Sequence, residues 1–129
     1  MKARTLVRGF AVLDVAVTAP LAVPGLGALW LQLLLGGAGL LPPPEAWSIT
    51  PPALLFAQLA GVLGACWNGA RARWPDDRRL VGIDAVARVA VAVLLLFWLL
   101  SGAPPVLGLF IVTELAGAAV AVGVLRRRA

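Results

Sequence analysis

Four long apolar stretches constrain this chain more than any other feature of its sequence. A helix that crosses a bilayer needs ~20 mainly apolar residues, and the stretches at about 5–24, 52–71, 80–100 and 105–125 meet this need. The breaks between them fall at clusters of proline and glycine, which end helices. The pattern predicts an all-α integral membrane protein, a bundle of four transmembrane helices that forms a single membrane-embedded domain over residues 1–129.

Composition supports this class. The chain is 61% hydrophobic and 13% charged, with a mean hydropathy of +0.96, whereas soluble domains carry about 25% charged residues. The net charge is +5, but the basic residues flank the apolar stretches and do not form one continuous face. We therefore expect the lipid bilayer as a partner and no nucleic acid.

The positions of the cations predict the orientation of the helices. The flanking cations form three groups: Lys2, Arg4 and Arg8; Arg71, Arg73, Arg78 and Arg79; Arg126, Arg127 and Arg128. The segments that join the first helix to the second and the third to the fourth have no cation, and one of them has Glu45. The positive-inside rule then places both termini in the cytoplasm, in a multi-pass protein of the inner (cytoplasmic) membrane.

Residues 25–41, "GLGALWLQLLLGGAGLL", are apolar enough to suggest a fifth span. A fifth span would move the loop at 71–79 to the outside and divide the cations between the two faces. We expect an interfacial or re-entrant helix here instead, with Trp30 and Trp47 as anchors at the outer surface. A cleavable signal peptide at the N-terminus is the less favoured alternative, because Asp14 falls in its apolar core.

The second and fourth predicted helices share a pattern of small residues. Each has a Gln or Glu followed, after three and seven positions, by small residues: Gln58, Gly61 and Ala65 in one, Glu114, Gly117 and Ala121 in the other. Small residues at this spacing allow close approach of helices in a membrane. They predict a buried seam within the bundle or a surface for homo-oligomers.

Several kinds of chemistry are disfavoured by what the chain lacks. There is no histidine, and Cys66 is the only cysteine. We therefore expect no disulfide within the chain, no metal site and no cofactor, and no phosphate-binding or dinucleotide-binding motif is present.

The polar residues inside the apolar stretches are the candidates for a site: Asp14, Gln58, Asn68, Arg71, Asp84, Arg88 and Glu114. With a rise of ~1.5 Å per residue, Asp14 and Arg88 both lie roughly 12 Å from their helix ends. We expect a buried chain of charges, Asp14–Arg88–Asp84, with Asn68 and Arg71 at its mouth. Pairing is favoured because one unpaired charge in the bilayer costs on the order of 3 kcal/mol.

Glu114 and Gln58 lie nearer the bilayer centre by the same reckoning. No cation is expected at the depth of Glu114, so its carboxyl would be neutral and hydrogen-bonded to Gln58 or Thr113. The whole set of polar residues has two interpretations. They fix the register of the helices, or they form a functional site, as ionisable residues in membranes often do.

The functional interpretation is a polar pocket, open to the inner leaflet, that binds a lipophilic small molecule. Glu114 and Asp14 would be catalytic. Glu114 would donate a proton, and Asp14, held ionised by Arg88, would accept one. This chemistry suits a cofactor-independent isomerase or cyclase, of the lyase type, acting on an isoprenoid-like or lipid-like (terpenoid) substrate.

Two functions outside enzymology compete with this one. The first is a non-catalytic membrane subunit or a small oligomeric carrier, in which the charges only fix the packing of the helices. The second is an exporter of quaternary amines or drugs, which would need one central acid among aromatic residues, here Glu114 with Phe110 and Trp98.

Overall fold

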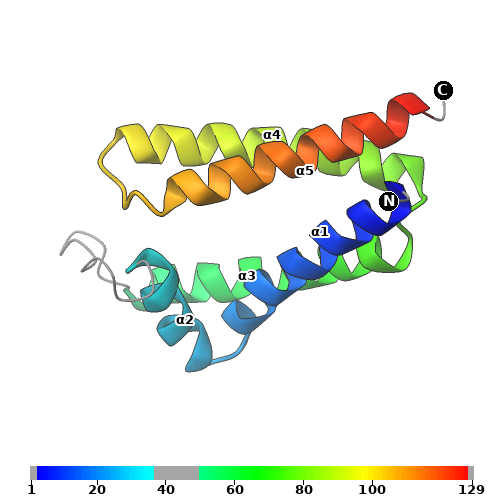
Figure 1. Cartoon of the computed structure of the whole chain (residues 1–129). Helices are drawn as coiled ribbons and strands as arrows, with labels where there is room; N and C mark the ends of the chain where they lie inside the picture. The colour runs from blue at the N-terminus through cyan, green and yellow to red at the C-terminus, as the bar shows by residue number, and fades with distance from the viewer. Residues whose placement is uncertain (1–2, 37–49, 128–129) are drawn as a thin grey trace.

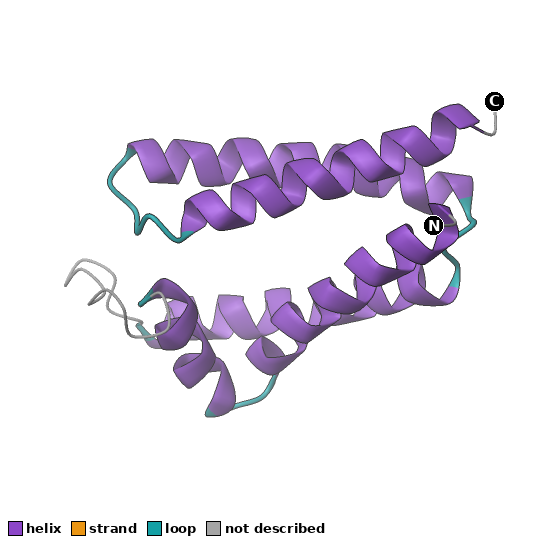
Figure 2. Cartoon of the chain, viewed as in Figure 1, coloured by secondary structure: helices purple, strands orange, loops and turns teal. Residues whose placement is uncertain are grey.

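The computed structural model describes residues 3–36 and 50–127, and within these residues it contains helices and turns but no strand. The helices are α1 (Ala3–Thr18), the 3-10 helix η1 (Ala19–Ala22), α2 (Leu26–Leu35), α3 (Pro51–Arg73), α4 (Arg78–Leu100) and α5 (Leu107–Arg127) (Figures 1 and 2). Four segments are long and apolar enough to cross a membrane: Arg4–Ala22, Pro51–Arg73, Arg78–Leu100 and Leu107–Arg126. The predicted all-helical architecture with four candidate spans is thus confirmed, and it indicates a multi-pass membrane protein.

Residues at the predicted breaks define where two of the long helices begin. Thr50 caps α3 by accepting a hydrogen bond from the Ala53 N–H at 3.4 Å, and Pro51 occupies the first helical turn. Asp77 caps α4 by accepting hydrogen bonds from the N–H groups of Arg79 and Leu80, at 2.8 and 3.2 Å. Both choices are typical of helix starts, because the cap satisfies a free N–H and proline has none to satisfy.

The stretch predicted as an interfacial or re-entrant helix contains α2. With 10 residues, α2 is too short to cross a membrane, for which about 20 are needed. Trp30, predicted as an interfacial anchor, is half-buried, and its Nε1 donates to the backbone oxygen of Val17 at 2.9 Å. This bond holds α2 against the end of α1. The rest of the stretch, and the predicted anchor Trp47, lie outside the described residues.

The long helices form two pairs. α1 packs along α3, and α4 packs along α5. In Figure 1 the pairs approach each other at the end that holds both termini and the α3–α4 turn, and they diverge toward the α4–α5 loop. At the closed end, a buried apolar cluster of Val7, Val81, Ala85, Ala121 and Val124 joins α1, α4 and α5.

The small residues of α3 and α5 are used for packing within the chain. A Cβ atom at Gly61 would lie 2.6 Å from the backbone nitrogen of Ala22, so only glycine lets η1 approach α3 this closely. Gly117 on α5 is likewise covered, by the side chain of Arg88. The predicted seam is therefore present inside the bundle, and homo-oligomers through these stripes stay a prediction.

Candidate functional site

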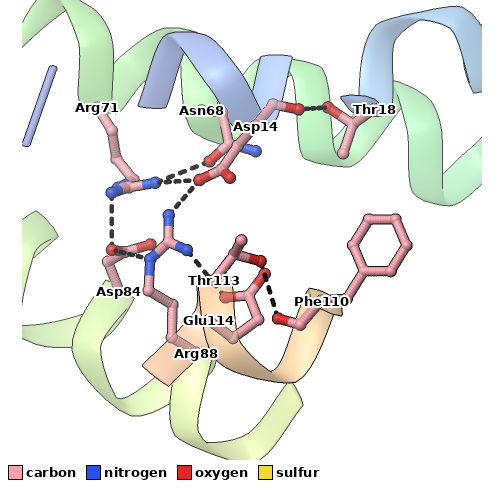
Figure 3. A network of polar contacts seen from close by, with 9 residues as sticks. All are labelled: Asp14, Thr18, Asn68, Arg71, Asp84, Arg88, Phe110, Thr113 and Glu114. Carbon is pink, nitrogen blue, oxygen red and sulfur yellow. Dashed lines mark hydrogen bonds and ion pairs between the residues drawn. The ribbon is translucent and has the colours of Figure 1, made fainter. Parts of the chain in front are cut away.

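Arg88, on α4, is the centre of a buried network of charged side chains (Figure 3). Its Nε donates to Asp84 Oδ2 at 3.0 Å and its Nη1 to Glu114 Oε2 at 2.9 Å. Its Nη2 donates to Asp14 Oδ2. One side chain thereby binds carboxylates of α1, α4 and α5, and the predicted chain Asp14–Arg88–Asp84 is present.

Arg71, on α3, is a second bridge. Its Nη2 lies 2.8 Å from Asp84 Oδ2, and its Nη1 donates to Asp14 Oδ2 at 3.1 Å and to Asn68 Oδ1 at 2.9 Å. The expectation that Arg71 and Asn68 lie at the mouth of the network was wrong, because both are buried, at 3% and 7% exposure. α3 continues past Arg71 to Arg73, so Arg71 lies within the helix and turns inward toward two carboxylates.

The expectation that no cation lies at the depth of Glu114 was also wrong, since Arg88 Nη1 donates to its Oε2. Counted along the backbones, Arg88 and Glu114 differ in depth by three residues, about 4.5 Å, and the long side chain of Arg88 spans that difference. Thr113, one proposed partner of Glu114, instead donates from Oγ1 to the backbone oxygen of Phe110 at 2.8 Å. Gln58, the other, lies ten residues before Asn68 on α3, about 15 Å along the helix, and does not line the site.

Two residues that were not predicted to belong to the site enclose the guanidinium group of Arg88: Phe10 and Gly117, the latter predicted only for helix packing. The ring of Phe10 lies with its centroid 5.6 Å from Cζ, a distance at which the ring attracts a cation. A Cβ at Gly117 would lie 2.7 Å from Nη1. The signal for Phe10 was its position four residues before Asp14, on the same face of α1.

A cavity of about 330 Å³ lies against this network. All four long helices line it. Its polar wall is formed by Asp14, Asn68, Asp84, Arg88 and Glu114, and its apolar walls include Leu13, Val17, Trp67, Val91, Leu109 and Phe110. The volume is at the small end of the range for pockets that bind small molecules, about 300–1,000 Å³.

The cavity extends away from the end of the bundle that holds the termini. Val17 follows Asp14 along α1, and Val91 follows Arg88 along α4, so both lie on the side of the α4–α5 loop. The opposite side is filled by the apolar cluster around Val7 and Val81. The prediction that the pocket opens to the inner leaflet depends on the orientation of the helices in the membrane and stays a prediction.

Charge balance is the main electrostatic property of the network. Three carboxylates, those of Asp14, Asp84 and Glu114, face two guanidinium groups, those of Arg71 and Arg88. Fully ionised, the network therefore has one excess negative charge. In the described part of the chain no three His, Cys, Asp or Glu side chains gather as a metal site would require.

No protein-family model matches the chain, and neither a curated protein nor a solved structure shows significant similarity to it.

Proposed function

We propose that this protein is an acid–base enzyme of the cytoplasmic membrane that isomerises or cyclises a lipophilic, isoprenoid-like or lipid-like molecule. One observation carries the proposal. Asp14 and Glu114 belong to different helix pairs, yet both bind Arg88 at the wall of one cavity. An acid and a base on either side of a substrate is the arrangement that proton transfer between its carbon atoms requires.

The excess negative charge causes the network to hold one proton, which the reaction can use. An unneutralised charge in an apolar surrounding is costly, so one carboxyl of the network takes up a proton. Asp14 accepts charged hydrogen bonds from Arg71 and Arg88, whereas Glu114 accepts one from Arg88 alone. Because each such bond stabilises the ionised form, the proton resides on Glu114, and Asp14 is the proton acceptor.

The reaction that follows needs no oxidant, metal or cofactor. The electron pair of a substrate double bond takes the proton of Glu114, which leaves a carbocation on the adjacent carbon. Asp14 removes a proton from a neighbouring carbon, and the electron pair of that C–H bond forms a new double bond. The product is an isomer of the substrate. If another double bond attacks the carbocation before the proton is lost, the product is cyclic.

A purely architectural role is the second candidate. It is favoured by the way Arg71 and Arg88 connect all four long helices, since such a network can specify one packing arrangement. In that case the protein is a non-catalytic membrane subunit or a small carrier. The excess carboxylate is the feature that this role does not need, because two guanidinium groups are balanced by two carboxylates.

Solvent deuterium provides a test that requires no knowledge of the substrate. Purified protein is incubated with a lipid extract of host membranes in heavy water, and the extract is analysed by mass spectrometry. We expect one class of lipophilic compound to gain deuterium on carbon in the presence of the wild type and not with Glu114→Gln. Gln58→Leu, a change outside the cavity, serves as the control and should behave as the wild type. Identical extracts from all three incubations would contradict the proposal.

A further inference from the structure

The carboxylates and hydroxyls of the cavity between Asp14 and Glu114 are hydrogen-bond acceptors, and the amide nitrogen of Asn68 is a donor on the same polar wall. Thr18 Oγ1 donates to the backbone oxygen of Asp14 at 2.7 Å, and Thr113 Oγ1 donates to that of Phe110 at 2.8 Å. Each hydroxyl has a single proton, so both present lone pairs to a ligand. Each nitrogen of Arg88 already donates to a carboxylate, and its side chain is only 5% exposed. The carboxylates and hydroxyls therefore favour a ligand that donates hydrogen bonds.

Two carboxylate oxygens are free to receive that donor. The contacts of Asp14 fall on Oδ2, and those of Glu114 fall on Oε2. Among the hydrogen bonds and ion pairs of residues 3–36 and 50–127, none reaches Asp14 Oδ1 or Glu114 Oε1. The two side chains are 21% and 22% exposed, against 5% for Asp84. They are thus the two carboxylates that a ligand can reach, and Figure 3 shows them on either side of Arg88.

The excess negative charge decides the charge of the ligand. The network reaches neutrality by binding one proton or one other monovalent cation. An anionic ligand would add a negative charge to a buried site, and a neutral ligand would leave the proton on Glu114, whereas a cationic ligand can take the place of that proton. Arg71 and Arg88 each bind both Asp14 and Asp84, so they provide no further compensating group.

The remaining walls favour an organic cation over a metal ion. Trp67 and Phe110 bring aromatic rings to the cavity, and Leu13 and Val17 bring apolar side chains. Aromatic faces attract ammonium groups, and apolar walls attract a hydrocarbon body. A volume of about 330 Å³ holds a compact molecule.

We propose that the cavity binds a lipophilic organic monocation, a protonated amine that lies between Asp14 and Glu114 and replaces the proton of the network. The inference uses the same cavity as the proposed enzyme but requires no reaction there. In an enzyme that forms a carbocation, such an amine occupies the place of the charged intermediate. In a carrier, it is the cargo.

Three probes that share one hydrocarbon cage but differ in charge separate the effect of ligand charge on binding from the effect of ligand size. 1-Adamantylammonium, 1-adamantanol and adamantane-1-carboxylate are titrated by calorimetry into the full-length protein in lipid nanodiscs. We expect the ammonium to bind at one per chain and at least about tenfold tighter than the alcohol, since a charge-assisted hydrogen bond contributes about 1.5–3 kcal/mol. The carboxylate should not bind.

Variants of the protein distinguish binding of the probe in the cavity from partition of the probe into lipid. Glu114→Gln should weaken binding of the ammonium by at least about tenfold and leave binding of the alcohol unchanged. Gln58→Leu is the matched control on α3 and should bind both as the wild type does. Should Glu114→Gln fail to fold, Thr113→Val, which keeps the shape and removes one acceptor, should weaken the ammonium alone by a few-fold.

Equal affinity for ammonium and alcohol, or ammonium binding that survives in both Glu114→Gln and Asp14→Asn, would overturn the inference. The solvent-deuterium test is independent of these titrations. Deuterium transfer without preference for the ammonium would contradict the cation site and support the proposed enzyme. Preference for the ammonium without deuterium transfer would support the cation site and contradict the proposed enzyme.

Discussion

Gly117 of α5 lies directly against the guanidinium group of Arg88 on α4. A Cβ at position 117 would lie 2.7 Å from Nη1 and 2.8 Å from Cζ and Nε. The guanidinium group has little room to withdraw, because it binds carboxylates of α1, α4 and α5. The absence of a side chain at 117 is therefore what lets α5 approach α4 at the level of the charges.

Gly117→Ala should destabilise the protein. The added methyl group displaces a side chain that makes three ion pairs, and overpacking of this kind typically costs about 1–3 kcal/mol. Gly123→Ala is the control on the same helix, because a Cβ there has no atom within 4 Å. It should be neutral or stabilising, since alanine favours helices by about 0.5–1 kcal/mol over glycine. Thermal unfolding in one detergent measures both, and equal effects would contradict the contact.

Removal of Arg88 should be among the most damaging single changes. Arg88→Met leaves three carboxylates facing Arg71 alone, and uncompensated buried charges cost about 3–5 kcal/mol. Glu114 is the one of the three without a contact to Arg71, so adding Glu114→Gln to Arg88→Met should recover part of the loss. The two single variants and the double variant form a thermodynamic cycle. A double variant no more stable than Arg88→Met would show that the pair does not interact.

The fold was predictable from the sequence to the level of helices, and the partners of the charges were predictable only in part. Apolar length and the proline clusters placed the four long helices, because these signals are local. Asp14 and Arg88 could be paired because each lies eight residues after the residue at which its helix is predicted to enter the membrane, Leu6 and Leu80. The roles of Glu114 and Arg71 required knowledge of which way a long side chain turns and which helices are neighbours, and neither is encoded in spacing along one helix.

Charge reversal illustrates the same limit. Depth alone suggests that exchanging Asp14 and Arg88 would preserve their ion pair. In the structure, an arginine at 14 would face Arg71, and an aspartate at 88 would face Asp84 and Glu114. The combination Asp14→Arg with Arg88→Asp should therefore be less stable than Arg88→Met, as thermal unfolding would reveal. Recovery toward wild-type stability would contradict the network.

Close packing of α3 on η1 leads to a prediction about the small residues of α3. A Cβ at Gly61 would collide with backbone atoms of Leu21 and Ala22, at 2.6–2.9 Å, and backbone cannot rotate away. Gly61→Ala should thus lower the unfolding temperature, whereas Gly69→Ala, with no atom within 4 Å, should not. If Gly61 served association between chains instead, the variant would change the oligomeric state in size-exclusion chromatography with light scattering and leave thermal stability intact.

Orientation in the membrane is tested by reporter fusions. The positive-inside rule predicts a cytoplasmic signal from fusions after Arg79 and after Ala129, and an external signal from one near Glu45. An external signal after Arg79 would overturn the proposed orientation and the assignment of four spans.

The thermal stability of Glu114→Gln tests the central claim, that the third carboxylate serves function and not folding. Glutamine has nearly the shape of protonated glutamate and can still accept from Arg88. In the variant the network keeps two carboxylates, those of Asp14 and Asp84, with two guanidinium groups, and the network is neutral. We predict that it unfolds at the same temperature as the wild type or higher, as is common when a residue is retained for function at the expense of stability. A loss of stability close to that of Arg88→Met would contradict the claim and identify Glu114 as part of the architecture.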